Sequence, residues 1–142
     1  MIEAKLVRDM SFPAQRVWAV LEDYGNMAWT GAPEFNVIGE GIGMIRQVIM
    51  PGLEPIDEVL EMMDRENMTF SYSIPRGLPL PLTDYRSTAA LERLGDNDTR
   101  VYWSCQCTPT DDSMTDADVE KLMQGVYSDL LDSLEAYLGK VE

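Results

Sequence analysis

A helical stretch before the C-terminus constrains the fold more than any other part of this sequence. From Thr115 to Leu138, apolar residues recur at spacings of three and four over about six turns, the pattern of an amphipathic helix. Thr115 is a suitable N-cap, and Gly139 is placed to end the helix at the C′ position. Such a helix is about 36 Å long. The rest of the chain reads mostly as strands, so we expect a sheet to wrap it.

Upstream of this helix, hydrophobic alternation predicts about seven strands. They lie at residues 2–9, 36–41, 43–50, 56–63, 68–74, 83–92 and 99–108. The segment 56–63 fits either a helical or a strand period and is assigned as a strand because it is short and lies between turns. Ser11 is expected to cap a short helix with Pro13 in its first turn, and residues 27–30 form one further turn. Short connections indicate an antiparallel sheet, so one α+β domain over residues 1–142 is predicted.

The composition excludes several classes of function. The 142 residues carry a net charge of −14 at pH 7, and such a surface repels phosphate backbones and anionic headgroups. Nucleic acid is therefore not an expected partner. No apolar run approaches the roughly 18 residues of a membrane span, and the N-terminus lacks the apolar core of a signal peptide. We expect a cytoplasmic protein without stable membrane insertion.

The absence of histidine narrows the chemistry further. With no histidine and only three lysines, the chain is not expected to use a Ser–His or Cys–His pair, a His-containing metal site or a Schiff-base lysine. No phosphate-binding glycine motif is present, so we expect no cofactor and no metal. Cys105 and Cys107 share one face of a predicted strand and are too far apart for a disulfide, so both are expected as reduced thiols in the core.

Polar residues on the predicted strands are candidates for a ligand site. Tyr85 and Ser87 share a face with a small residue, which fits a clamp for a ligand carbonyl or hydroxyl, although a buried tyrosine can also bond to the backbone. Glu58 has apolar neighbours on its face; if buried it would suit a general acid or base, and if not it is a surface glutamate. Arg46, on one face with Val48, could pair with Glu58, hold a ligand carboxylate or lie on the outer surface.

The segment 41–60, GIGMIRQVIMPGLEPIDEVL, resembles the START/birch-pollen-allergen helix-grip superfamily (SRPBCC), which includes polyketide cyclase-like proteins. Residues 51–87 are also similar to the gate-to-latch region of plant abscisic-acid receptors. The resemblance follows the element order over 12–138. It implies a curved sheet around the last helix, two short helices after the first strand, and an apolar pocket reached past loops 51–55 and 75–81.

Carried over position by position, the resemblance implies that Glu58, Tyr85 and Ser87 hold polar groups of a ligand, with Gln106 at or near a further such position. The lysine that would hold the hormone's carboxylate has no counterpart, and Leu80 replaces the latch histidine. Hormone reception is therefore not implied. The predicted ligand-binding residues are Arg46, Val48, Glu58, Tyr72, Tyr85, Ser87, Gln106 and, on the pocket side of the helix, Leu122, Val126 and Leu130.

These expectations leave three functions open. The first is a binding protein for a hydrophobic small molecule that is lipid-, polyketide- or terpenoid-like. The second is a polyketide cyclase/dehydratase-type enzyme in which Glu58 and Tyr85 are the catalytic candidates. The third is an interaction module whose loops 51–55 and 75–81 dock a partner. The missing histidine and the few lysines favour binding over catalysis, and a homodimer is left open.

Overall fold

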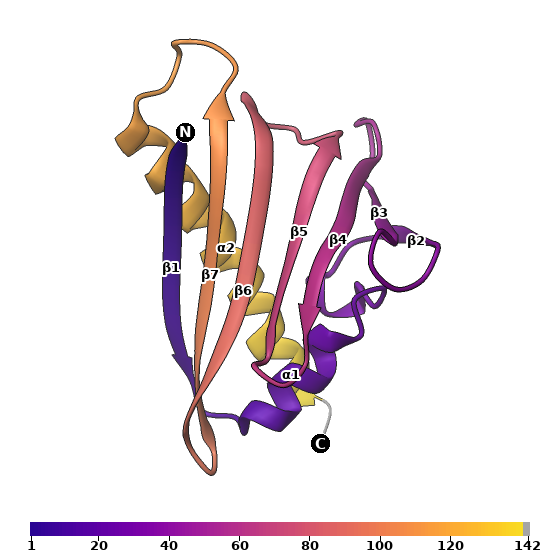
Figure 1. The fold of residues 1–142 in the computed structure, drawn as a ribbon, viewed down its shortest axis with the longest axis vertical. Helices are drawn as coiled ribbons and strands as arrows, with labels where there is room; N and C mark the ends of the chain where they lie inside the picture. Colours follow the sequence, from indigo (N-terminus) through magenta and orange to yellow (C-terminus); the bar gives the residue numbers. More distant parts are fainter. Residues whose placement is uncertain (141–142) are drawn as a thin grey trace.

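A seven-stranded antiparallel sheet curves around one long helix in the computed structural model, which describes residues 1–140 (Figure 1). The strands are β1 (Ile2–Met10), β2 (Glu34–Ile38), β3 (Ile45–Ile49), β4 (Ile56–Asp64), β5 (Thr69–Arg76), β6 (Leu82–Gly95) and β7 (Asp98–Pro109), and the helices are α1 (Ala14–Glu22), the 3₁₀ turn η1 (Ala28–Thr30) and α2 (Asp116–Lys140). The spatial order of the strands is β1-β7-β6-β5-β4-β3-β2. The predicted helix-grip fold is confirmed.

Glycine explains why β2 and β3 are shorter than predicted. Gly39, Gly41 and Gly43 have φ values of 82°, 69° and 92°, a left-handed conformation that side chains disfavour and that interrupts strand pairing. The chain therefore turns at 39–44, which alternation alone had assigned partly to strands. β6 and β7 are instead longer than predicted because their ladder continues to Gly95 and Asp98, on either side of a two-residue turn.

The long helix α2 lies across the concave face of the sheet. Its buried side chains are Val119, Met123, Tyr127, Leu131, Leu134 and Leu138. Thr115 caps it as predicted, because the Thr115 Oγ1 atom accepts a hydrogen bond from the Asp118 N–H at 3.1 Å and the Asp118 carboxylate accepts one from the Thr115 N–H at 2.9 Å. The prediction for Gly139 is wrong: it has no positive φ, and the helix continues to Lys140.

The start of α1 also differs from the prediction. Ser11 does not cap this helix; Pro13 occupies the N-cap position with φ −60° and ψ 140° and makes no side-chain cap bond. Its carbonyl instead accepts hydrogen bonds from the N–H groups of Arg16 and Val17. Arg16 also donates from Nη2 to the Leu138 carbonyl at 2.6 Å, so α1 supports the C-terminal end of α2.

The helix cap gives a direct test of how the start of α2 is stabilised. Thr115→Ala removes the acceptor for the Asp118 N–H, and loss of such a cap lowers the free energy of unfolding by about 1 kcal/mol. Urea denaturation followed by circular dichroism measures the change. Thr110→Ala, in the preceding loop, is the matched control and should change little. Equal stabilities for the two variants would contradict the capping role.

Candidate functional site

A pair of buried tyrosines joins the sheet to α2. Tyr85 on β6 and Tyr127 on α2 are 4% and 1% exposed, and their hydroxyl groups are hydrogen-bonded to each other. Nearby, the Tyr72 hydroxyl accepts a hydrogen bond from Trp103 Nε1 at 3.3 Å. Ser87, which is fully buried, donates from Oγ to the Ser104 carbonyl at 2.8 Å. These groups form a polar cluster, Tyr72, Tyr85, Ser87 and Tyr127, between the sheet and α2.

Burial keeps the phenols of this cluster protonated. Loss of water contact raises the pKa of Tyr85 and of Tyr127 well above the usual value, and it raises the pKa of Tyr72 as well. At neutral pH these hydroxyl groups are therefore neutral hydrogen-bond donors. Cys105 and Cys107 are free and buried as predicted, and burial raises the pKa of the Cys107 thiol to about 11.

Aromatic rings surround the polar cluster. Phe70 packs edge-on against Trp103 with ring centroids 5.9 Å apart, and Trp103 lies 6.3 Å from both Trp29 and Tyr127. These rings belong to the buried cluster between the sheet and the helix. The methionines Met10 and Met123, each nearly fully buried, are the most adaptable members of this cluster because their side chains are unbranched and flexible.

A buried ion pair lies at the β3–β4 side of the interior. Arg46 and Glu58 are direct cross-strand partners, and Arg46 Nε donates to Glu58 Oε1 at 2.7 Å. Arg46 Nη1 donates to the Tyr24 carbonyl at 3.2 Å, and its guanidinium lies 4.0 Å from the centre of the Tyr24 ring. Burial works to lower the pKa of Arg46, but the charge of Glu58, the nearby phenols of Tyr24 and Tyr72 and the hydrogen bond to Glu58 together outweigh it, and the pKa is raised.

This arrangement decides between the alternatives for Arg46. The side chain pairs with Glu58 inside the protein, on the same face as Val48, and does not lie on the outer surface. Glu58 is also turned inward, with its side chain 14% exposed. Because its carboxylate is engaged by Arg46, it holds a buried cation in place rather than standing free in the interior.

Removal of the Glu58 charge tests this buried pair. Glu58→Gln leaves the Arg46 guanidinium buried without an anionic partner, and breaking such a pair lowers the free energy of unfolding by about 3 kcal/mol. The comparison is Asp9→Asn, which breaks the exposed Asp9–Arg100 pair at 2.7 Å and should have little effect. If urea denaturation shows a similarly small decrease in the free energy of unfolding for both variants, the Arg46–Glu58 pair contributes no more to stability than an exposed pair.

The two loops expected to control access touch each other. Gly77 has φ +86°, and a Cβ atom there would collide with the Pro55 carbonyl oxygen. The β3–β4 and β5–β6 connections therefore meet over one end of the sheet, the end at which β7 leads into α2 (Figure 1). Leu78 and Leu80 are partly buried against the core at this end.

A pair of glycine variants tests this contact. Gly52 also has a positive φ, 78°, but a Cβ atom added there would have no neighbour within 4 Å, so Gly52→Ala should cost only the backbone strain of about 1 kcal/mol. Gly77→Ala adds a collision with Pro55 and should lower the free energy of unfolding by at least about 2 kcal/mol more. Equal effects in a denaturation experiment would contradict the close loop contact.

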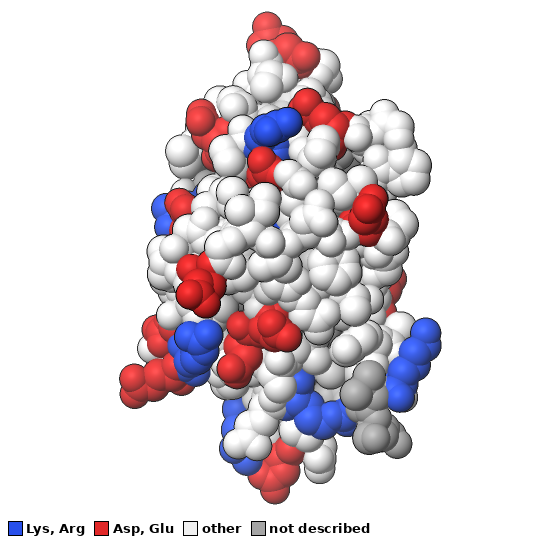
Figure 2. All heavy atoms as spheres, turned by 90° about the vertical axis from the view of Figure 1, so that its right-hand side faces the viewer, with Lys and Arg blue, Asp and Glu red and all other residues white. Residues whose placement is uncertain are grey.

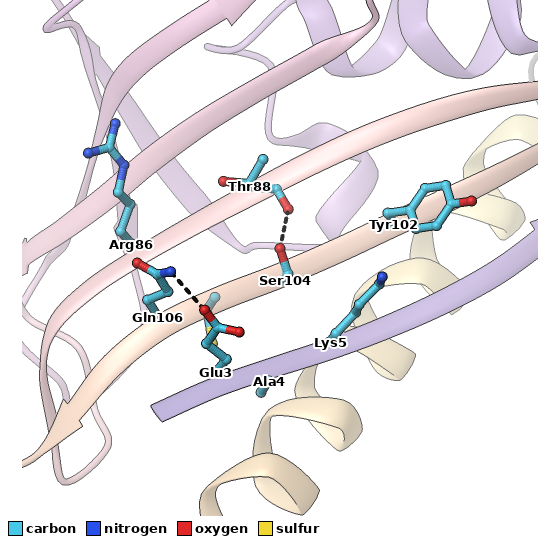
Figure 3. A pocket seen from close by; sticks show the side chains of 9 residues that line it. Glu3, Ala4, Lys5, Arg86, Thr88, Tyr102, Ser104 and Gln106 are labelled. Carbon is cyan, nitrogen blue, oxygen red and sulfur yellow. Dashed lines mark hydrogen bonds between the residues drawn. The ribbon is translucent and has the colours of Figure 1, made fainter. Parts of the chain in front are cut away.

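Gln106 is not part of the interior. It lies on the outer face of the sheet, where its Nε2 atom donates to Glu3 Oε1 at 2.9 Å. Figure 3 shows it in a depression of about 560 Å³ formed by β1, β6 and β7. Strand alternation is the physical reason, because the buried Cys105 and Cys107 on either side turn Gln106 outward. The prediction that Gln106 lies at or near the interior pocket is therefore corrected.

The helix residues expected to face the pocket are also placed differently. Val126 is 39% exposed and Leu122 is half-buried, and both line an open groove on the outer side of α2. Leu130 is half-buried and packs against the core. The inward positions are Met123 and Tyr127, one residue further along the chain. The apolar stripe is wider than the buried face, so its period alone does not show which part faces the sheet.

Tyr127 is the principal residue that the sequence prediction missed as a site residue. Its phenol lies in the apolar stripe of α2, and a tyrosine in that position needs a hydrogen-bond partner once buried. The need of a buried phenol for a hydrogen-bond partner is the feature of the sequence that points to Tyr127. Within residues 1–140, no helix is long and apolar enough to cross a membrane, and no three Cys, Asp or Glu side chains gather as metal ligands.

Comparison with known proteins identifies the family. A family described as polyketide cyclase / dehydrase and lipid transport matches residues 1–139. The chain belongs to this family. No protein of curated description matches the sequence.

Solved structures agree with this membership. An uncharacterised protein from Bacillus thuringiensis is 26% identical, with 96% of this chain and 98% of that chain covered and a TM-score of 0.82. The protein XoxI from Bacillus cereus is also 26% identical, with 97% and 96% covered and a TM-score of 0.82. Norcoclaurine synthase from Thalictrum flavum, solved with dopamine and hydroxybenzaldehyde, is 15% identical, with 99% and 87% covered and a TM-score of 0.75. This last likeness concerns the fold alone.

Proposed function

We propose that this family member binds a hydrophobic small molecule, lipid-, polyketide- or terpenoid-like, between the sheet and α2. The observation that carries the proposal is the hydrogen-bonded pair Tyr85–Tyr127 at the centre of an aromatic interior. A core built for stability alone gains little from two phenols, because each hydroxyl needs a partner after burial. A ligand carbonyl or hydroxyl group could form hydrogen bonds with both phenols.

The chemistry of the cluster supports a neutral or weakly polar ligand. The raised pKa values of Tyr85 and Tyr127 keep both phenols protonated, so each can donate a hydrogen bond to a ligand oxygen. Arg46, which is the one buried cation among the described residues, is already balanced by Glu58. A ligand with a large apolar body and a carbonyl or hydroxyl group fits this charge balance.

Entry of such a ligand would depend on the adaptable parts of the interior. The contact between Gly77 and Pro55 would open, and flexible side chains such as Met123 would move aside. The apolar loop residues Leu78 and Leu80 would then close on the bound molecule. The bound ligand would thus take the place of contacts between side chains in the ligand-free protein.

Two phenylalanine variants test the proposal. Nile red, an apolar dye with a ring carbonyl, is the probe, and its fluorescence reports binding. Tyr85→Phe and Tyr127→Phe each remove one hydroxyl and should weaken dye binding by about tenfold, the effect of one lost hydrogen bond. Tyr102→Phe is the control, since the Tyr102 hydroxyl bonds to Glu92 on the outside of the protein. Equal binding by all three variants would contradict the phenol anchor.

A second candidate function is catalysis of a cyclisation or dehydration. The observation that favours it is again the protonated phenols, which could stabilise negative charge on a substrate carbonyl oxygen by donating hydrogen bonds, although their raised pKa values make them poor proton donors. Glu58 would act as the basic partner only if Arg46 released it. If Glu58→Gln and Tyr85→Phe leave the turnover of a candidate polyketide unchanged while both variants remain folded, this acid–base proposal fails and the binding proposal is unaffected.

A further inference from the structure

The two edges of the sheet are protected very differently. β1 forms one edge, and α2 lies along it: Gln124 Nε2 donates to the Lys5 carbonyl at 3.2 Å, and Arg8 bonds to Asp132 at 2.6 Å. β2 forms the other edge, and no strand in residues 1–140 pairs with its open side. Its sequence, EFNVI, contains no lysine, proline or bulge, which are common protections of an exposed edge, and its one charged residue is Glu34 at the start of the strand.

Exposed apolar side chains are concentrated on β2 and in the connections at either end of β3. Of the nine large apolar side chains exposed in the described chain, five lie between residues 37 and 53. They are Val37, Ile38, Ile42, Met50 and Leu53. The most exposed of them is Ile42, at 63%. Apolar patches of this kind mark interaction surfaces.

The same segment is depleted of charge. Between residues 35 and 53 the only charged residues are Glu40 and Arg46, and Arg46 is buried, whereas 25% of the whole chain is charged. Figure 2 shows the side of the molecule that carries β2, with a broad uncharged area in its middle. Depletion of charge is typical of the centre of a protein interface. For chains that each carry −14, a segment with so few charges reduces the repulsion between two copies that meet there.

We infer that β2 pairs with β2 of a second copy of the chain, antiparallel and around a two-fold axis at Asn36. In this register Phe35 faces Val37 of the second copy, which joins two apolar side chains on the concave face. Glu34 faces Ile38 of the second copy, so no two like charges are opposed. The edge is therefore complementary to itself, which favours a second copy over an unrelated partner.

Sedimentation equilibrium over a concentration series measures the dimer directly. The wild-type chain should form a species of twice its 16.0 kDa mass. Ile38→Glu places a carboxylate opposite Glu34 of the second copy at two symmetric positions, and we expect the dimer to weaken by about tenfold or more. Leu94→Glu adds the same charge at an exposed position of β6, away from this edge, and should leave the dimer intact.

A charge reversal then tests the register. Combining Ile38→Glu with Glu34→Lys puts opposite charges at the two facing positions and should restore the dimer. Circular dichroism confirms that each variant is folded, so a lost dimer is separated from a lost fold. A wild-type chain that stays monomeric would overturn the inference and assign this edge to another partner. A dimer that Ile38→Glu leaves intact would overturn it too, as would a failure of the double variant to restore association.

Discussion

The structure depends on the burial of one face of α2 against a curved sheet. Six side chains of this helix are shielded from water, and full burial of such side chains stabilises a fold by roughly 1.5–3 kcal/mol each. The ends are held by polar contacts, Thr115 with Asp118 at the start and Arg16 with the Leu138 carbonyl at the finish. Arg8 adds bonds from β1 to Asp132 and Glu135 near the middle of the contact. The position of Tyr127, and so the geometry of the interior, follows from this packing.

At the sites described above, the buried polar groups lie in hydrogen-bonded pairs, whereas Trp18 Nε1 and Ser71 Oγ are buried without a hydrogen-bond partner among residues 1–140. Tyr85 bonds to Tyr127, Ser87 to a carbonyl of β7, and Arg46 to Glu58. Each pair joins two different elements, so the polar contacts fix the relative position of sheet, helix and strands while the aromatic rings supply the apolar contact area. A bound molecule with one polar group could exchange a single hydrogen bond in such an interior without leaving a buried group unpaired.

Much of the fold was predictable because two patterns of apolar residues are strong in the sequence: the alternation typical of strands and the spacing of three and four typical of a helix. Alternation located most of the strands and placed Arg46 on the same face as Val48, segment length located β4, and the helical period located α2. The errors arose where a second constraint acts. Positive φ at Gly39, Gly41 and Gly43 ends strand pairing early. The resemblance placed Gln106 in the pocket, whereas alternation with Cys105 and Cys107 turns it outward. The width of the apolar stripe hid the choice between Val126 and Tyr127, which depends on how the sheet curves.

Native mass spectrometry of the protein, purified gently from the cells that make it, tests ligand binding most directly. We expect a non-covalent complex heavier than the 16.0 kDa chain, which releases an apolar molecule with a carbonyl or hydroxyl group when the protein is denatured. The same purification of the Tyr127→Phe variant should yield less of this complex. A chain that carries no such molecule, and that takes up none from a lipid extract of the same cells, would contradict the central claim.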